Sequence, residues 1–124
     1  MNPWVLIGLA ALFILGGASV AYGVKTGAVP SDRPEVVYMR GVLARIWANH
    51  GYRLTITSGL DGEHKDDSLH YEGLAEDYRS RDIKREDLAI LQREAQAALG
   101  PNYQFFLEYL NGSNEHFHGE FDPD

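Results

Sequence analysis

The sequence predicts an α+β domain, in which two helices pack on a small, mainly antiparallel sheet, preceded by an N-terminal transmembrane or signal helix. Two segments with apolar residues at helical spacing and four with alternating residues follow one another in the order α-β-β-α-β-β. The 124 residues suffice for one small domain, which we expect to be a monomer. The net charge of −7 argues against a nucleic-acid partner, because phosphate backbones attract clustered cations.

The N-terminal segment is apolar, and residues 1–24 contain no Asp, Glu, Lys or Arg. A helix over residues 4–22 would reach about 28 Å, close to the hydrocarbon thickness of a membrane. A retained anchor is the first interpretation. A cleaved signal is the alternative, because residues 19–21 are small, although a basic n-region is missing. Both predict a membrane-anchored or exported domain facing the periplasm or cell wall, whereas Lys25 and Arg33 would favour the cytoplasm by the positive-inside rule.

The next segment, residues 25–34, collects Gly, Pro, Ser and Asp and is typical of a linker, so that the folded domain is expected over residues 35–124. Residues 35–49 are predicted to form an amphipathic helix that ends before Gly51. Its apolar stripe consists of Val36, Met39, Leu43, Ile46 and Trp47. Residues 52–58 alternate apolar and polar side chains, as a half-buried strand does.

The second half of the domain is predicted to contain three strands and one helix. Residues 74–79 predict a short strand, and residues 82–99 predict a helix capped by an Asp and stopped by Gly-Pro. Two aromatic strands are expected over residues 103–110 and 116–121. Residues 111–114, Asn-Gly-Ser-Asn, have the composition of a hairpin turn between them.

Four of the five histidines lie in two short stretches, and they predict a metal site. His70 and Asp77 can converge if the chain turns between them and enters a strand. Alternation places His116 and His118 on one face of the last strand. The chain has no cysteine, so any metal must be held by His and carboxylate. Two histidines and one aspartate match the ligand count of an open catalytic zinc site.

Two motifs give the sequence a specific resemblance. Residues 68–77, SLHYEGLAED, fit the S-x-H-x-x-G-x-A-x-D pattern of zinc D-alanyl-D-alanine carboxypeptidases and related peptidoglycan peptidases, and residues 115–118, EHFH, fit their E-x-x-H. SLHYEG with the acidic loop before it and the later H-x-H also resembles the signalling domain of hedgehog proteins, which shares that fold. The likeness covers residues 35–121.

This resemblance implies roles for individual residues. The implied zinc ligands are His70, Asp77 and His118. Glu115 would be the general base, and His64 and His116 would match two accessory histidines that flank the metal. Glu115 and His118 have opposite parity on a regular strand, so that Glu115 would need a turn or bulge to face the metal. Glu108 is therefore the alternative base.

Two classes of function follow. The first is a zinc metallopeptidase that hydrolyses peptidoglycan stem peptides as a D,D-carboxypeptidase or endopeptidase. The apolar N-terminal segment also resembles the releasable anchors of some phage lysis enzymes, which would make the protein an endolysin. Such peptidases commonly carry an arginine that binds the substrate carboxylate, at the position that corresponds to the neighbourhood of Ser58. This chain has no arginine there, so that Arg53, Arg79 or Arg81 would replace that arginine. The second class is a non-catalytic, zinc-stabilised binding module similar to hedgehog.

Overall fold

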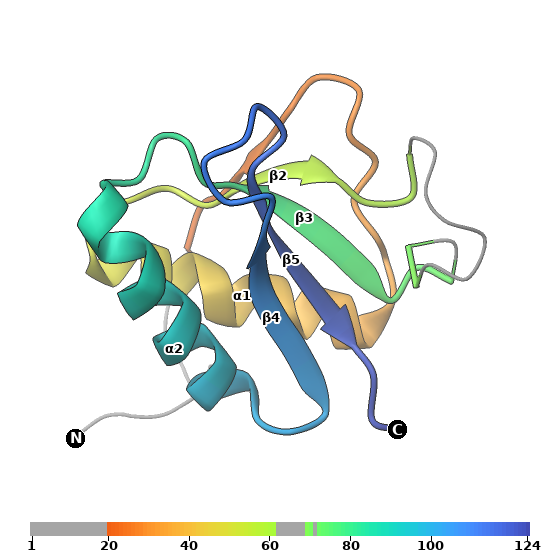
Figure 1. The fold of residues 1–124 in the computed structure, drawn as a ribbon. Coiled ribbons are helices and arrows are strands. Elements are labelled where there is room, and N and C mark those ends of the chain that lie inside the picture. The colour runs from red at the N-terminus through yellow and green to blue at the C-terminus, as the bar shows by residue number, and fades with distance from the viewer. Residues whose placement is uncertain (1–19, 62–68, 71) are drawn as a thin grey trace.

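The structure is a computed structural model that describes residues 20–61, 69–70 and 72–124. The described part of the chain forms a five-stranded sheet, two α-helices and one 3-10 turn (Figure 1). Their bounds are β1 Gly23–Val24, α1 Pro34–Asn49, β2 Thr55–Ser58, β3 Ala75–Arg79, η1 Arg85–Asp87, α2 Leu88–Leu99, β4 Tyr103–Glu108 and β5 His116–Phe121. The strand order is β1-β2-β3-β5-β4, and every pair except β1 with β2 is antiparallel. The predicted α+β class is confirmed.

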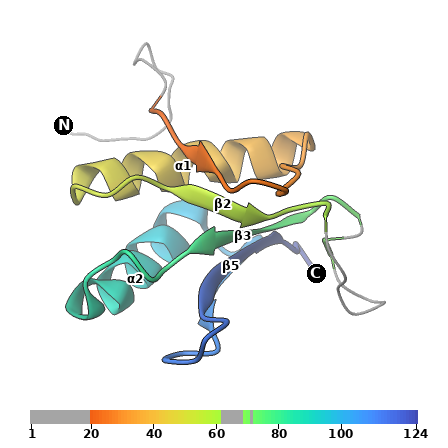
Figure 2. The same cartoon turned by 90° about the horizontal axis from the view of Figure 1, so that it is seen from above.

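Helix α1 covers one face of the sheet, along which it runs in Figure 2. Pro34 occupies its first turn, where the missing N–H costs nothing. After its last residue Gly51 adopts a φ of 84°, a conformation that favours glycine. The side of α1 that faces the sheet buries Trp47, whose ring meets Phe105 and Phe117 edge-on at centroid distances of 5.9 and 5.4 Å. All three aromatic residues belong to the hydrophobic core.

The second helix begins later than the sequence predicts. The chain after β3 first makes a turn in which Ile83 N–H bonds to the Ser80 carbonyl at 3.1 Å, and the helical region starts at η1 with no capping side chain. Asp82 is therefore not the helix cap. Burial of Ile83 explains the difference, because the turn places this side chain in the core. The predicted end is confirmed, since Gly100 follows α2 with a φ of 85°.

Strand β1 has no counterpart among the predicted elements. It pairs in parallel with β2, and Gly23 and Lys25 donate their N–H groups to the carbonyls of Leu54 and Ile56 at 2.8 Å. The expected linker over residues 25–34 also contacts the domain, because Ser31 is buried. Two residues are too short for a periodic pattern, which is why the sequence did not predict this strand.

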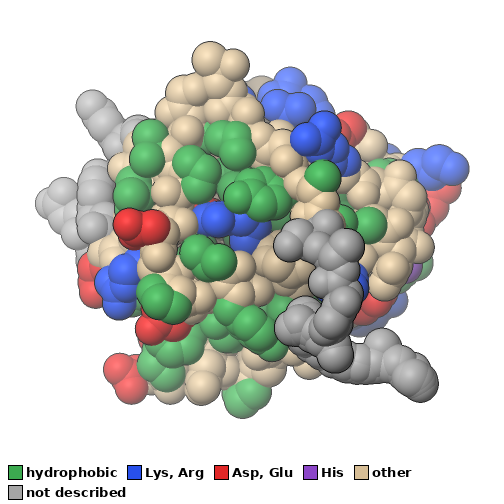
Figure 3. Space-filling view, turned by 180° about the vertical axis from the view of Figure 1, so that it is seen from behind, with side chains coloured by type: hydrophobic (Ala, Val, Ile, Leu, Met, Phe, Trp, Pro, Cys, Tyr) green, Lys and Arg blue, Asp and Glu red, His purple; other side chains and the backbone are tan. Residues whose placement is uncertain are grey.

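No helix within the described residues is long and apolar enough to cross a membrane. The predicted anchor over residues 4–22 lies almost wholly outside the described residues, so that it stays a prediction. Seen from behind, the molecule shows hydrophobic side chains among charged ones (Figure 3). The exposed side of α1 contributes hydrophobic residues to the surface, namely Val37 and Tyr38.

The register of the three strands β3, β5 and β4 determines which side chains meet on the other face of the sheet. Asp77 of β3 and Phe106 of β4 both pair with His118 of β5, and Glu108 pairs with His116. Alternate residues of these strands are buried in the core, among them Tyr78, Phe105 and Phe117. Since alternate side chains point to opposite faces, the polar set lies on the face away from the core.

Candidate metal centre

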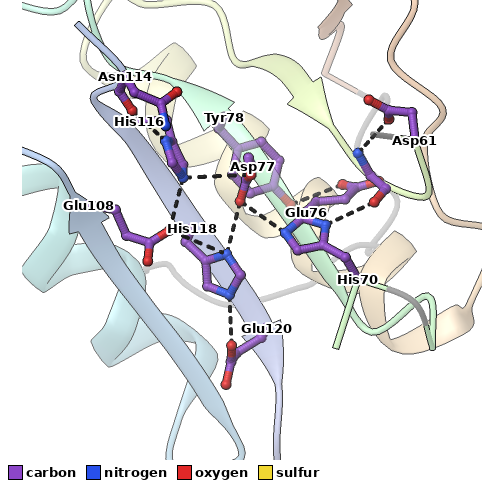
Figure 4. A network of polar contacts seen from close by, with 11 residues as sticks. Asp61, His70, Glu76, Asp77, Tyr78, Glu108, Asn114, His116, His118 and Glu120 are labelled. Carbon is purple, nitrogen blue, oxygen red and sulfur yellow. Dashed lines mark hydrogen bonds and ion pairs between the residues drawn. The ribbon is translucent and has the colours of Figure 1, made fainter. Parts of the chain in front are cut away.

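Three side chains converge at the middle of β3. His118 Nδ1 lies 2.9 Å from Asp77 Oδ1, and His70 Nε2 lies 3.2 Å from the same oxygen (Figure 4). All three residues are buried, and their possible ligand atoms lie within 4.8 Å of one another. The structure thus brings together the three residues expected to be metal ligands.

His70 reaches the site from the loop before β3, as the sequence predicts. The chain turns directly after it, where the N–H of Gly73 donates to the His70 carbonyl at 3.0 Å and Gly73 has a φ of 75°. Leu74 N–H closes the same turn on the Leu69 carbonyl at 2.9 Å. Ala75 lies between this turn and Asp77, on the same face of the strand as Asp77, and is buried.

Hydrogen bonds on the outer nitrogens fix the orientation of both histidines. His70 Nδ1 lies 2.8 Å from the Gly59 carbonyl, which can only accept, so that Nδ1 carries the proton and Nε2 presents a lone pair to Asp77. His118 Nε2 lies 2.7 Å from Glu120 Oε1 and leaves Nδ1 toward the centre. Such outer partners orient ligating histidines in metal sites. The arrangement therefore presents converging electron pairs to a cation.

The electrostatics of the centre favour an ionised aspartate. Burial opposes the charge on Asp77, but its contacts with His118 and His70 outweigh burial and hold the pKa of Asp77 well below its usual value. Burial also opposes protonation of His118, yet its contacts with the carboxylates of Asp77 and Glu120 raise the pKa of His118. At neutral pH Asp77 is a carboxylate, the form that binds a metal ion.

Glu108 and His116 border the three convergent residues. His116 Nε2 lies 2.9 Å from Glu108 Oε1 and 3.6 Å from Asp77 Oδ2, while its Nδ1 donates to the Asn114 carbonyl at 2.8 Å. Glu108 Oε1 also lies 3.9 Å from His118 Nδ1. The side chain of Glu108 is 34% exposed, so that solvent reaches its carboxylate. Of the two glutamates considered as a base, the structure places Glu108 at the centre.

Glu115, the expected base, is not brought to this centre. Its carboxylate accepts hydrogen bonds from Arg85 at 2.5 and 3.0 Å, from the Ser80 hydroxyl at 2.6 Å and from the Asn111 N–H at 2.8 Å. The hydrogen bond from Arg85 is the main cause that lowers the pKa of Glu115 to about 2. Glu115 lies in the turn before β5, and its contacts with Arg85 and Asn111 hold it away from the two strand histidines.

Two further residues bear on the site, one that the sequence predicts and one that it does not. His64 lies outside the described residues, so that its role as an accessory histidine stays a prediction. Glu120 was not among the expected site residues, although it holds the outer nitrogen of His118. Its position two residues after His118, on the same face of the last strand, is the signal that could have indicated it.

Comparison of the sequence with models of protein families finds a match over part of the chain. The family model of the hedgehog amino-terminal signalling domain matches residues 34–106, more than half of the chain. The matched region contains His70 and Asp77 and ends before Glu108, His116 and His118. The chain therefore belongs to the family of hedgehog amino-terminal signalling domains.

Proposed function

We propose that this protein is a zinc-dependent metallopeptidase that hydrolyses peptide bonds of peptidoglycan stem peptides. The observation that carries the proposal is the position of Glu108 at the metal centre, within 4.8 Å of Asp77 and 3.9 Å from His118 Nδ1. A carboxylate that contacts a three-residue metal group without belonging to it is suited to accept a proton during hydrolysis. A purely structural site has no need of such a group.

The donor set fits zinc better than other common ions. Two imidazole nitrogens and one carboxylate oxygen are ligands typical of catalytic zinc, whereas calcium and magnesium prefer oxygen ligands throughout. The three ligands proposed here, His70, Asp77 and His118, leave room for water or substrate, because a closed structural zinc site uses four. Zinc at this site would supply Lewis-acid chemistry, that is, activation of water and polarisation of a peptide carbonyl.

The surrounding side chains would perform the proton transfers. Glu108 would accept a proton from the attacking water and pass it to the leaving amine. His116, held by the Asn114 carbonyl, orients Glu108 through the 2.9 Å contact. When protonated, His116 could also donate to the oxygen on which charge develops. Glu115 is a poor base by comparison, because a carboxylate with a pKa of about 2 binds protons weakly at neutral pH.

Arg79 is our candidate for recognition of a substrate carboxylate. It follows Asp77 by two residues in β3 and pairs with His116, so that it shares the polar face of the sheet. Its Nε is buried and has no hydrogen-bond partner within the described residues. A guanidinium binds carboxylates through two parallel hydrogen bonds.

Digestion of purified muropeptides by the full-length zinc-loaded protein tests the proposal. Glu108→Gln should keep the zinc and slow cleavage by roughly 10²–10⁴-fold, because Gln retains the shape but cannot accept the proton. Glu115→Gln is the matched variant, and we expect it to slow cleavage much less than Glu108→Gln does. If Glu115→Gln carries the large loss instead, Glu115 is the base. If the wild-type protein with bound zinc cleaves no peptidoglycan fragment near neutral pH, the peptidase proposal fails.

A zinc-stabilised binding module is the second candidate function, and the family match to a signalling domain favours it. In that case zinc removal would weaken folding, and Glu108→Gln would change no catalytic rate. For either function we propose that residues 4–22 keep the domain at or beyond a membrane, facing the cell wall. Recovery of the unprocessed full-length chain in the soluble cytoplasmic fraction would overturn this location and exclude a cell-wall substrate.

A further inference from the structure

We propose that Asp77, Glu108 and His116 form a second divalent-cation site beside the first, and that a second zinc ion suppresses hydrolysis. The possible ligand atoms of these three residues also lie within 4.8 Å of one another. The inference rests on the proposed zinc peptidase, because Asp77 is shared with the first site and Glu108 is its proposed base. The existence of the second site does not depend on any catalytic activity.

The carboxylate of Asp77 is placed to serve two ions. Its Oδ1 faces His70 and His118 at 3.2 and 2.9 Å, whereas its Oδ2 faces His116 at 3.6 Å (Figure 4). The two oxygens thus contact different histidines. Paired metal ions lie roughly 3.5–4 Å apart in two-metal hydrolytic sites, a spacing that one carboxylate can span with its two oxygens.

His116 is oriented as a ligand in the same way as His70. Its Nδ1 lies 2.8 Å from the Asn114 carbonyl, which can only accept a hydrogen bond, so that Nε2 holds the lone pair of the neutral ring. This nitrogen lies 2.9 Å from Glu108 Oε1, which is also an acceptor. Two acceptors facing each other at this distance require a cation or a proton between them.

The net negative charge of the cluster favours binding of a second cation. Three carboxylates surround the histidines, namely Asp77, Glu108 and Glu120. One divalent ion compensates two of these three negative charges. The remaining negative charge favours binding of a further cation. The second site should bind more weakly than the first, because it shares Asp77 and because His116 and Glu108 are less buried than His70 and His118.

Occupation of the second site would remove the proposed base. A glutamate whose carboxylate binds an ion is no longer available to accept a proton, and a His116 bound through Nε2 can no longer carry a proton there. One zinc ion per chain would therefore support hydrolysis, and excess zinc would suppress it.

Equilibrium titration of the full-length protein with Zn²⁺ tests the site without any measurement of activity. The wild-type protein should bind two ions per chain, one tightly and one weakly. His116→Ala and Glu108→Gln, which lie on different strands, should each lose the weak ion and keep the tight one. His50→Ala and Glu94→Gln are matched controls, because these residues form an exposed His–Glu contact of 2.7 Å, and both should keep two ions.

The outcomes separate this inference from the function on which it rests. A wild-type protein that binds only one ion at saturation, or a weak ion that survives both His116→Ala and Glu108→Gln, overturns the second site and leaves the peptidase intact. Loss of both ions in Asp77→Ala, together with loss of the tight ion alone in His70→Ala, supports the shared arrangement, in which only Asp77 belongs to both sites. If two ions bind and muropeptides are cleaved equally at one and two ions per chain, the inhibitory role is wrong.

Discussion

The backbone carbonyl of Gly59 positions a proposed ligand, and no side chain fits there. A Cβ at this position would lie 2.2 Å from the Val29 carbonyl oxygen, a backbone atom that cannot rotate away. Gly59→Ala must therefore shift the segment whose carbonyl accepts from His70 Nδ1. Loss of such an outer partner typically weakens metal affinity by roughly 10–100-fold. We expect a fall of that size in zinc affinity, measured by competition with a chelator.

Gly41→Ala is the control for this substitution. Gly41 lies in α1, and a Cβ there would meet nothing within 4 Å. Alanine in a helix is favoured over glycine by roughly 0.5–1 kcal/mol, so that this variant should be as stable as the wild type or slightly more so, with unchanged zinc affinity. Equal affinities in the two glycine variants would contradict the role assigned to Gly59.

The lowered pKa of Glu115 predicts that the stability of the protein, rather than its catalysis, depends on pH through this residue. Its pKa falls from the ordinary 4.5 to about 2 in the folded protein, mainly through the hydrogen bond from Arg85. A lowered carboxyl pKa contributes stability that is fully present above pH 4.5 and is lost as the pH falls toward 2. Glu115→Gln should cost about 1 kcal/mol at pH 6, a modest value because solvent screens the half-exposed Arg85.

Urea unfolding of both proteins between pH 6 and pH 2 measures this contribution. The difference in the free energy of unfolding between wild type and Glu115→Gln should shrink as the pH falls. A difference that stays constant over this range would mean that the carboxylate of Glu115 gains nothing from Arg85.

At the scale of elements, a buried ion pair joins α1 to β3. Glu76 is completely buried and accepts hydrogen bonds from Arg40 of α1, from the Ser31 N–H at 2.9 Å and from the Tyr78 hydroxyl at 3.0 Å. Glu76→Gln would leave the buried guanidinium without its counter-charge, which typically costs about 3–5 kcal/mol. We expect a loss of this size in the free energy of unfolding, measured with a chemical denaturant.

An exposed ion pair in the same region provides the comparison. Arg33 and Glu35 lie 3.9 Å apart with partly exposed side chains, so that Glu35→Gln should cost less than about 1 kcal/mol. Similar losses in the Glu76 and Glu35 variants would show that burial of the Arg40–Glu76 pair does not determine its importance.

The periodic elements were predictable because their patterns follow directly from burial. Alternation placed Asp77 and the strand histidines on one face, and the structure brings them together across β3 and β5. The start of α2 and strand β1 were not predictable, since one depends on a turn that buries Ile83 and the other on pairing with a distant strand. Both features arise from tertiary contacts that no local pattern records.

The meeting of the three expected ligands was predictable from motif spacing, but which glutamate lies beside them was not. The sequence allowed either Glu108 or Glu115 near the metal ligands, and the conformation of the hairpin between them places Glu108 there. Tyr109 and Asn111 adopt positive φ values of 55° and 65°, and Asn111 N–H binds Glu115. This turn keeps Glu115 with Arg85 and leaves Glu108 opposite His116. Residue types in a turn do not determine such a path.

At the scale of the whole molecule, the proposed metal joins parts of the chain that are distant in sequence. His70 comes from a loop, Asp77 from β3 and His118 from the last strand, so that the complete ligand set exists only in the folded chain. A ligand that binds only the native state stabilises it by RT ln(1 + [L]/Kd), about 2.7 kcal/mol at 100 times Kd. For a domain of this size that corresponds to a rise in Tm of roughly 10–20 °C.

Thermal unfolding of the full-length protein with zinc and with a chelator measures this coupling. The chelator should lower the Tm of the wild type by roughly 10–20 °C and leave that of His70→Ala almost unchanged, because this variant lacks the ion whose removal destabilises the fold. His50→Ala, altered at an exposed histidine outside the cluster, should respond like the wild type. An equal response in all three proteins would place the stabilising ion elsewhere, and no response in the wild type would mean that zinc does not bind the native state alone.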